Sequence, residues 1–333
     1  MNIILDAFGG DNAPKAIVEG AVQAVNAYSD IKVILTGKEE LIKEELALYN
    51  YDRSKIQVVN ATQVIDMAES PVEAIKRKND SSLVVGFNLL KEGKGQAFIT
   101  AGSTGATVAG ATLIVRRIKG VKRPALAPVM PTTKGTGVLL IDCGANVDCK
   151  PSYLAQFAQM GSIYMSKAQG VLNPRVGLLN NGAEEEKGNM LTKEAYAILK
   201  GMPLNFVGNV EARNVNSGDY DVVACDGFAG NIALKMMEGA AQTITSMLKE
   251  ELYKNFKSKI GALLAKGAFR RLKKRMDYTE YGGALLLGVN GCVIKAHGSS
   301  NARAIKSAVN QAREFIIGDL VNIIKEEITK VED

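Results

Sequence analysis

Residues 98–110 read FITAGSTGATVAG, which places a serine and a threonine in a glycine turn between an apolar run and a helical pattern. Two kinds of chemistry use this layout. A G-x-S-x-G elbow presents a nucleophilic serine, and this turn differs from that pattern at Ala101. Alternatively, the free N–H groups of a helix start, with Ser103 and Thr104, bind an anion such as phosphate. A simple hydroxyl cap of the helix is the third interpretation.

A nucleophilic serine requires a base, and the chain has one histidine, His297. Asp226 lies between Ser103 and His297, an order that some hydrolases use. His297 also follows an apolar run and precedes the sequence Gly-Ser-Ser at another expected helix start. This position suits proton transfer or anion binding near neutral pH, although a lone histidine is often structural.

Polar turns rich in glycine follow six apolar runs of the chain. They read DAFGGDNAP (6–14), TAGSTGA (100–106), DCGANVD (142–148), LNNGAEEEKGN (179–189), CDGFAGN (225–231) and KAHGSSN (295–301). Because ligands bind at the carboxyl ends of strands in open α/β sheets, the six turns predict one site built from the whole chain. Any one of them alone is an ordinary turn.

Two of these turns carry further candidates for chemistry. Asp226 and Asn231 would orient a substrate or stabilise an oxyanion, unless Asp226 only caps the next helix. Glu184 or Glu185 would orient a neighbouring group while Lys187 faces a phosphate, unless this charged loop is simply solvated.

The elements that position these turns alternate along the chain. We expect strands at 2–7, 32–37, 55–60, 96–101, 137–143, 175–180, 205–210, 220–226 and 292–298, and helices at 14–27, 38–49, 80–92, 103–117, 152–168, 192–200, 229–251 and 301–327. This alternation predicts an α/β protein of three layers, α/β/α, with a mostly parallel mixed sheet. The 333 residues show no linker, so we expect one catalytic domain over 1–333, with two intertwined lobes as the alternative.

No cofactor is predicted. No expected helix opens with G-x-G-x-x-G, and no Walker phosphate loop occurs, so nothing supports a dinucleotide or ATP. The four cysteines form no C-x-x-C pair, which favours reduced thiols in a cytoplasmic protein over a zinc site. We expect neither a signal peptide nor a membrane-spanning run.

Several stretches, taken in order, resemble the bacterial phosphate acyltransferase family of phospholipid synthesis (the PlsX type). They are DAFGGDNAPKAIVEGA (6–21), TAGSTGA (100–106), RPALAPVMPT (123–132), DCGANVDCKPSYLAQFAQMG (142–161), VGLLNNGAEEEKGN (176–189), FVGNVEARNV (206–215), DVVACDGFAGNIALKMMEG (221–239) and YGGALLLGVNGCVIKAHGSSNARAI (281–305). The resemblance implies transfer of a fatty acyl group from acyl carrier protein to inorganic phosphate, which gives acyl phosphate. It also implies a homodimer and a fold similar to isocitrate and isopropylmalate dehydrogenases.

In that reaction phosphate is the nucleophile, so the protein must hold it against the thioester and stabilise an oxyanion. We therefore expect Ser103 to bind phosphate rather than attack. The expected phosphate ligands are Gly102, Ser103, Thr104, Gly105, Ser299 and Ser300; the catalytic residues are His297, Lys187, Asn231 and Asp226; the surrounding polar residues are Asp6, Gly9, Gly10, Asp11, Asn146, Lys150, Glu184 and Glu185. A phosphotransacetylase-like enzyme that uses acyl-coenzyme A is the main alternative.

The net charge of +6 is concentrated in residues 254–275, where nine Lys or Arg occur without an acidic residue. We expect a protruding amphipathic helical hairpin over 250–278, with two apolar stripes whose phase breaks near Gly267. Its contact residues would be Phe256, Lys257, Ile260, Leu263, Leu264, Arg270, Arg271 and Lys274. Peripheral contact with a membrane or a membrane acyltransferase, docking of carrier protein, or dimer packing would use this surface; nucleic acid would not.

Overall fold

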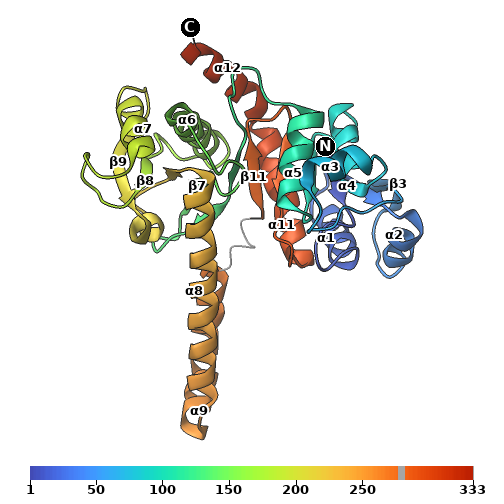
Figure 1. The fold of residues 1–333 in the computed structure, drawn as a ribbon. Helices are drawn as coiled ribbons and strands as arrows, with labels where there is room; N and C mark the ends of the chain where they lie inside the picture. The colour runs from blue at the N-terminus through green and yellow to red at the C-terminus, as the bar shows by residue number, and fades with distance from the viewer. Residues whose placement is uncertain (277–281, 333) are drawn as a thin grey trace.

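The computed structural model describes residues 1–276 and 282–332, and it divides their strands between two sheets (Figure 1). The larger sheet has the order β3-β2-β1-β4-β12-β11-β5, and the smaller has the order β6-β7-β10-β8-β9. The larger contains β1 (Asn2–Asp6), β2 (Lys32–Gly37), β3 (Ile56–Asn60), β4 (Ala97–Thr100), β5 (Ala125–Ala127), β11 (Ala284–Leu287) and β12 (Cys292–Lys295); the smaller contains β6 (Val129–Pro131), β7 (Gly137–Ile141), β8 (Val176–Asn180), β9 (Phe206–Glu211) and β10 (Val222–Ala224).

Most strand pairs are parallel, which confirms the predicted α/β class. The antiparallel pairs are β11 with β12, β11 with β5, and β6 with β7. All nine expected strands are present, but the expectation of a single sheet missed β5, β6 and β11. These strands have only three or four residues each, and Pro128 separates β5 from β6. Runs this short carry little periodic signal, so the crossing between the sheets was not predicted.

Helices cover both faces of each sheet. They are α1 (Lys15–Ala27), α2 (Glu39–Leu46), α3 (Pro71–Arg77), α4 (Ser82–Lys91), α5 (Thr104–Gly110, continued by a π turn over Ala111–Val115), α6 (Pro151–Lys167), α7 (Met190–Lys200), α8 (Gly227–Tyr253), α9 (Phe256–Leu264), α10 (Lys266–Met276), α11 (Ala302–Ile317) and α12 (Leu320–Glu332), with 3-10 turns at Arg53–Lys55 and Ala212–Ser217. On the larger sheet, Ile3 and Leu5 face the cluster of α1 and α11, while Ile4 faces the cluster of α4 and α5. Burial on both faces explains why the inner strands of this sheet, such as β1, are continuous apolar runs.

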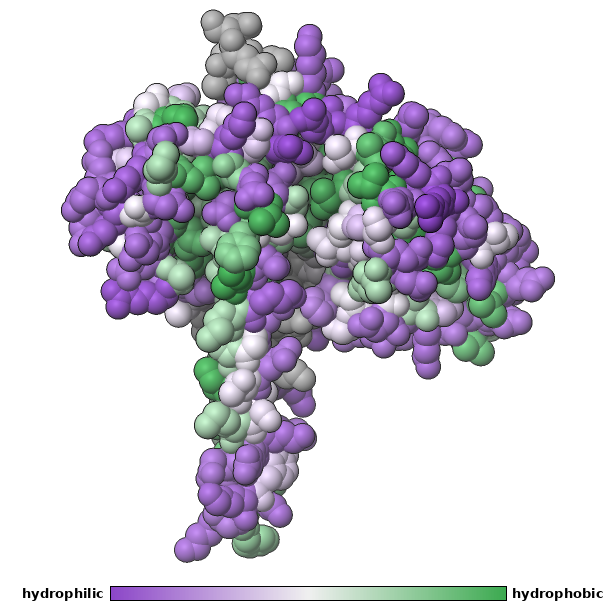
Figure 2. Space-filling model, in the orientation of Figure 1, coloured by the Kyte–Doolittle hydropathy of each residue, from purple (hydrophilic) through white to green (hydrophobic). Residues whose placement is uncertain are grey.

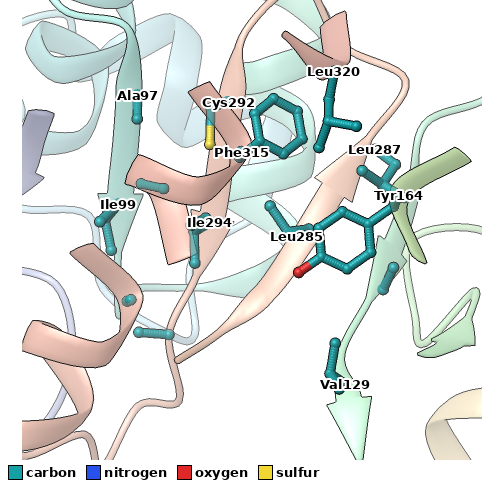
Figure 3. Packing of buried hydrophobic residues seen from close by; sticks show 14 of the residues in the cluster. Ala97, Ile99, Val129, Tyr164, Leu285, Leu287, Cys292, Ile294, Phe315 and Leu320 are labelled. Carbon is teal, nitrogen blue, oxygen red and sulfur yellow. The ribbon is translucent and has the colours of Figure 1, made fainter. Parts of the chain in front are cut away.

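One hydrophobic cluster continues from the larger sheet to the smaller. Figure 3 shows Tyr164 of α6 beside Leu285 and Leu287 of β11, with Phe315 of α11 nearby. All four of these side chains are buried. This shared core fixes the two sheets relative to each other, and with them the turns at their edges.

The long helix expected at 301–327 is wrong in one respect, because it is two helices. The first ends at Ile317, and the second starts at Leu320 after Gly318 and Asp319. Asp319 has φ of 48°, a left-handed conformation that no helix interior accepts. After the break, the second helix places the side chains of Leu320 and Ile324 in the shared core.

Helix α8 projects from the body, with α9 at its far end and α10 following α9 back toward the body (Figure 1). The helix is continuous from Gly227, so the projecting part starts well before residue 250. Helices α9 and α10 are separated at Ala265, close to the expected change of phase. The side chain of Lys274 lies outside the described residues, as do residues 277–281.

Candidate active site

Three of the glycine turns meet at one edge of the larger sheet, because β1, β4 and β12 are adjacent and parallel. The N–H of Asp11, after β1, donates to the carbonyl oxygen of Gly298 at 2.8 Å. The amide of Asn12 donates to the carbonyl oxygen of Ser299 at 3.1 Å. These bonds fix the turn of His297 against the turn that follows β1.

A buried carboxyl group organises the turn after β4. Oδ2 of Asp6 accepts from Oγ1 of Thr100 at 2.7 Å. Oγ1 of Thr100 accepts in turn from the N–H of Gly102 at 3.0 Å. Burial raises the pKa of Asp6, while hydrogen bonds to its carboxyl group, among them those from Ser82 and Thr100, oppose the rise. A Cβ on Gly9 would lie 2.7 Å from the same three groups, so only glycine permits this close approach.

Two further turns meet at the edge of the smaller sheet, after β7 and β10. The N–H of Gly227 donates to the carbonyl oxygen of Asn146 at 2.7 Å. The buried carboxylate of Asp142 accepts from the N–H of Asn146 at 2.7 Å and from the N–H of Leu126 in β5 at 2.8 Å. Asp142 therefore joins the two sheets beside the site.

A cavity of about 300 Å³ lies between these two sets of turns. Its polar lining comes from both sheets and comprises Thr104, Asn231, Lys235, Glu238, Lys295 and His297. The apolar lining comprises Leu126, Pro128, Val129, Met130, Cys143, Leu234 and Met237, and the remaining residues are Gly144, Gly282, Gly283, Ala284 and Ala296. Its size is at the lower end of the range of small-ligand sites, roughly 300–1,000 Å³.

Lys295 is a buried cation in this cavity, at the end of β12. Its Nζ donates to the carbonyl oxygens of Ala296 at 2.5 Å and of Ala101 at 3.3 Å. An ammonium group has three N–H donors, so these bonds leave one for a ligand. Burial, with the nearby Lys235, lowers the pKa of Lys295 to about 8. The group is still mostly charged at neutral pH and would favour an anion beside it.

This shift gives a prediction for stability against pH. The unfolded chain holds the Lys295 proton up to about pH 10.5, whereas the folded protein releases it near pH 8. Between these values the unfolded chain binds more protons, so stability rises with pH, by up to about 3 kcal/mol. Urea unfolding of the wild type and Lys295→Met at pH 8.0 and 10.5 measures it: the wild type should gain stability relative to the variant. An equal change in both would contradict the assigned pKa.

The ring of His297 has a defined orientation. Its Nδ1 accepts from the N–H of Ser299 at 3.2 Å and lies 2.8 Å from Oγ of the same serine. Since a backbone N–H only donates, the neutral ring carries its proton on Nε2, which makes Nε2–H the donor of the ring. Burial and the charge of Lys235 lower the pKa of His297, which keeps it neutral at pH 7.

Helix α8 contributes three polar side chains from one face. Asn231, Lys235 and Glu238 are spaced by four and three residues, so they point in similar directions. Lys235 pairs with Glu238 at 2.7 Å. Asp226 caps this helix, because its Oδ1 accepts from the N–H groups of Phe228 at 3.0 Å and Ala229 at 2.8 Å.

The turn of the opening serine lies at the same cavity. Ser103 is buried and caps α5, and its Oγ accepts from the N–H of Ala106 at 3.4 Å. Thr104 lines the cavity. The N–H of Gly102 donates to Thr100. The backbone N–H groups that a ligand could use at this helix start are therefore those of Thr104 and Gly105.

The structure places the other candidates outside the cavity lining. Lys187 and Glu184 are exposed in the turn after β8, and Glu185 pairs with Lys200 at 2.9 Å. Lys150 is exposed just before α6. Oγ of Ser300 is buried without a hydrogen-bond partner among the described residues. Gly10, with φ of 93°, packs against Ala101 and Gly298, as the turn contacts require.

Sequence reasoning missed Lys235, Glu238 and Lys295. Lys295 had a signal, because it ends the apolar run CVIK, where a buried cation is unusual. Lys235 and Glu238 are four and seven residues after Asn231, the spacing of one helix face. Among the described residues no group of three or more metal-ligating side chains occurs.

Proteins with similar sequences match this chain over nearly its whole length. Residues 1–322 match a family model described as fatty acid synthesis protein. A protein of Clostridium perfringens (strain SM101 / Type A) named phosphate acyltransferase is 53% identical over 99% of this chain and 97% of its own. One of Clostridium tetani with the same name is 52% identical over 100% of this chain and 99% of its own.

Solved structures share the fold at low identity. A phosphotransacetylase from Streptococcus pyogenes is 18% identical, covers 95% of this chain and 94% of its own, and has a TM-score of 0.66. A 4-hydroxythreonine-4-phosphate dehydrogenase from Klebsiella pneumoniae is 14% identical, covers 94% and 98%, and has a TM-score of 0.55. The expected similarity to a dehydrogenase fold is thus confirmed, and the extended sequence match shows that the chain belongs to the fatty acid synthesis protein family whose relatives are named phosphate acyltransferases.

Proposed function

We propose that this protein transfers an acyl group from the thioester of an acyl carrier protein to inorganic phosphate. A phosphate oxygen attacks the thioester carbonyl, the C–S bond breaks, and acyl phosphate and the carrier thiol leave. The observation that carries this proposal is the cationic cavity at the strand ends, where Lys295, Lys235 and a helix start converge. The names of the relatives support the reaction.

The cavity residues suit the separate needs of this reaction. Phosphate is already an anion at neutral pH, so the protein has to position it and neutralise charge rather than activate it. The start of α5, with Ser103 and Thr104, would hold the phosphate beside the Lys295 ammonium group. Nε2–H of His297 and the amide of Asn231 would donate to the oxyanion of the tetrahedral intermediate.

The acyl donor is the point at which the main alternative differs. A phosphotransacetylase-like enzyme would take acyl-coenzyme A instead of acyl carrier protein. We expect the purified protein to form acyl phosphate from palmitoyl carrier protein with a higher kcat/KM than from palmitoyl-coenzyme A. Equal or inverted values would favour the alternative, and no acyl phosphate from either donor would refute the proposal.

Ser103 provides a separate test of the phosphate position. Ser103→Ala removes a hydroxyl at the start of α5 but leaves the backbone amides, so phosphate KM should rise roughly tenfold with kcat little changed. Initial rates at varied phosphate measure this. A stable acyl adduct on Ser103 in the wild type would instead support the nucleophile interpretation.

We further propose that the tip of the projection contacts a membrane. Phe256, Ile260, Leu263 and Leu264 are exposed on one face of α9. Exposed Lys257 lies on the same helix, and exposed Arg270 and Arg271 lie on α10, which follows it. Apolar side chains flanked by cations are typical of helices that lie in an anionic interface, and the acyl phosphate product is itself lipophilic. No helix among the described residues is long and apolar enough to span a membrane.

Liposome flotation tests this contact. The protein should float with vesicles that contain anionic lipid and less with neutral ones, and Leu263→Asp with Leu264→Asp should reduce binding at least tenfold. Leu172→Asp is the matched control, because Leu172 is also an exposed leucine but lies after α6, away from the tip. No binding to either vesicle would refute the contact and leave carrier docking or dimer packing.

We also infer a homodimer, as the resemblance implies. Exposed Ile232, Met236, Ile244 and Met247 lie along α8, and Figure 2 shows apolar surface running down this helix. Contiguous exposed apolar surface of this kind is typical of a protein interface.

A further inference from the structure

The apolar side of the cavity plays no part in holding phosphate. Met130 and Cys143 are buried in a cluster between the smaller sheet and α8, and Leu234 and Met237 pack against the same cluster. Leu126 and Val129 also line the cavity and are buried, each in one of the two other hydrophobic clusters. The cavity therefore has an apolar lining made from side chains that are packed in three clusters.

Helix α8 keeps this lining apart from the polar residues. At 100° per residue, Leu234 and Met237 lie on one edge of the arc that faces the cavity, while Asn231 and Lys235 lie on the other. The cavity consequently has a polar side and an apolar side that meet along one helix. A ligand that fits both must be polar at one end and apolar directly beside it.

We propose that Leu126, Val129, Met130, Leu234 and Met237 form an acyl wall, which binds the carbons next to the thioester and determines which acyl groups react. This inference rests on the proposed function. An acyl thioester matches the cavity because its reacting carbonyl is polar and its alkyl chain begins one bond away. The Lys295 side would receive the phosphate and the oxyanion, and the acyl wall would receive the chain.

The cavity volume limits how much of the chain the acyl wall contacts. The same 300 Å³ must also hold the phosphate and the thioester carbonyl. Only the first carbons of a long chain fit, and the rest extends beyond the cavity. Selection should therefore act between short and medium acyl groups, while carbons beyond the medium length add little.

The test compares kcat/KM of the full-length protein for carrier protein loaded with acetyl, octanoyl or palmitoyl groups. Met237→Ala and Leu234→Asn should each lower the octanoyl-to-acetyl ratio about tenfold, because the acetyl group barely reaches the wall. Palmitoyl should fall by the same factor as octanoyl. The ratio comes from a single preparation, so partial loss of folded protein does not affect it.

Met190→Ala is the matched control, since Met190 is a methionine at the start of α7 that is 79% exposed, does not line the cavity and lies outside the proposed dimer surface. Its ratio should equal that of the wild type. An unchanged ratio in Met237→Ala and Leu234→Asn, or an equal fall in Met190→Ala, would overturn the acyl wall while leaving the transferase reaction in place. A wild type that is inactive with every acyl group would overturn the proposed function, and this inference with it.

Discussion

Replacing Lys295 by methionine should lower kcat/KM for phosphate by about 10²–10³-fold, the effect of removing one buried stabiliser of developing charge. Methionine has a similar length and no charge, so it removes the cation without opening a large hole. The wild-type rate should also fall above about pH 8, where Lys295 loses its proton, and the variant should not show this fall. Steady-state rates at varied phosphate and pH measure both effects.

Lys235→Met provides the comparison within the same cavity. Its side chain is 53% exposed and already paired with Glu238, so solvent screens its charge. We expect a loss of about tenfold or less. If the two lysine variants lose equal activity, burial is not what makes Lys295 effective; if Lys295→Met is fully active, the phosphate does not bind beside it.

Replacing His297 by alanine should reduce kcat about 10²–10³-fold, through loss of the Nε2–H donor at the oxyanion. The charged ring keeps Nε2–H but gains a proton on Nδ1, which can then no longer accept from the N–H of Ser299. The ring loses its orientation, so activity should also fall at acidic pH. The lowered pKa places that fall below the usual range of histidine. Single-turnover rates of acyl phosphate formation measure the chemical step directly.

Ser299→Ala is the control for the ring, because it removes only Oγ and keeps the backbone N–H that orients Nδ1. A loss of a few-fold is expected. An unchanged kcat in His297→Ala would exclude the histidine from the mechanism, whereas equal losses in both variants would assign the effect to the shape of the turn.

Most of the nine parallel strands were predictable because burial on both faces makes them continuous apolar runs, while the edge strands β3 and β9 are partly exposed and carry polar residues. The three short antiparallel strands were not, because their pairing is set by the crossing at Pro128 and by Asp142, which bonds to Leu126 of the other sheet. The break after Ile317 was hidden for a similar reason: it serves the burial of Leu320, a contact far away in sequence.

The site was predicted in outline for a related reason. Turns at the ends of adjacent parallel strands share an edge, so Thr104 and His297 were expected together and do line one cavity. Asn231 lines the same cavity from the smaller sheet, a placement that the expectation of a single sheet did not contain. Lys235 and Glu238 were missed because the prediction took only Asn231 from this helix. It did not follow the helical spacing of four and seven residues to the next polar side chains on the same face. The turn with Lys187 follows β8. In the smaller sheet β10 lies between β8 and β7, and the order of strands within a sheet could not be predicted from the sequence.

Helix α8 begins at the cavity and ends at the projecting tip, so one continuous helix connects the proposed reaction site to the proposed membrane contact. From Asn231 to Tyr253 it spans about 30 Å at 1.5 Å per residue. With the tip resting on a lipid surface, the helix would act as a spacer that holds the cavity at a fixed height above the headgroups. A freshly made acyl phosphate would then have to travel that height, which makes release and transfer, rather than bond making, the step that the geometry of this helix controls.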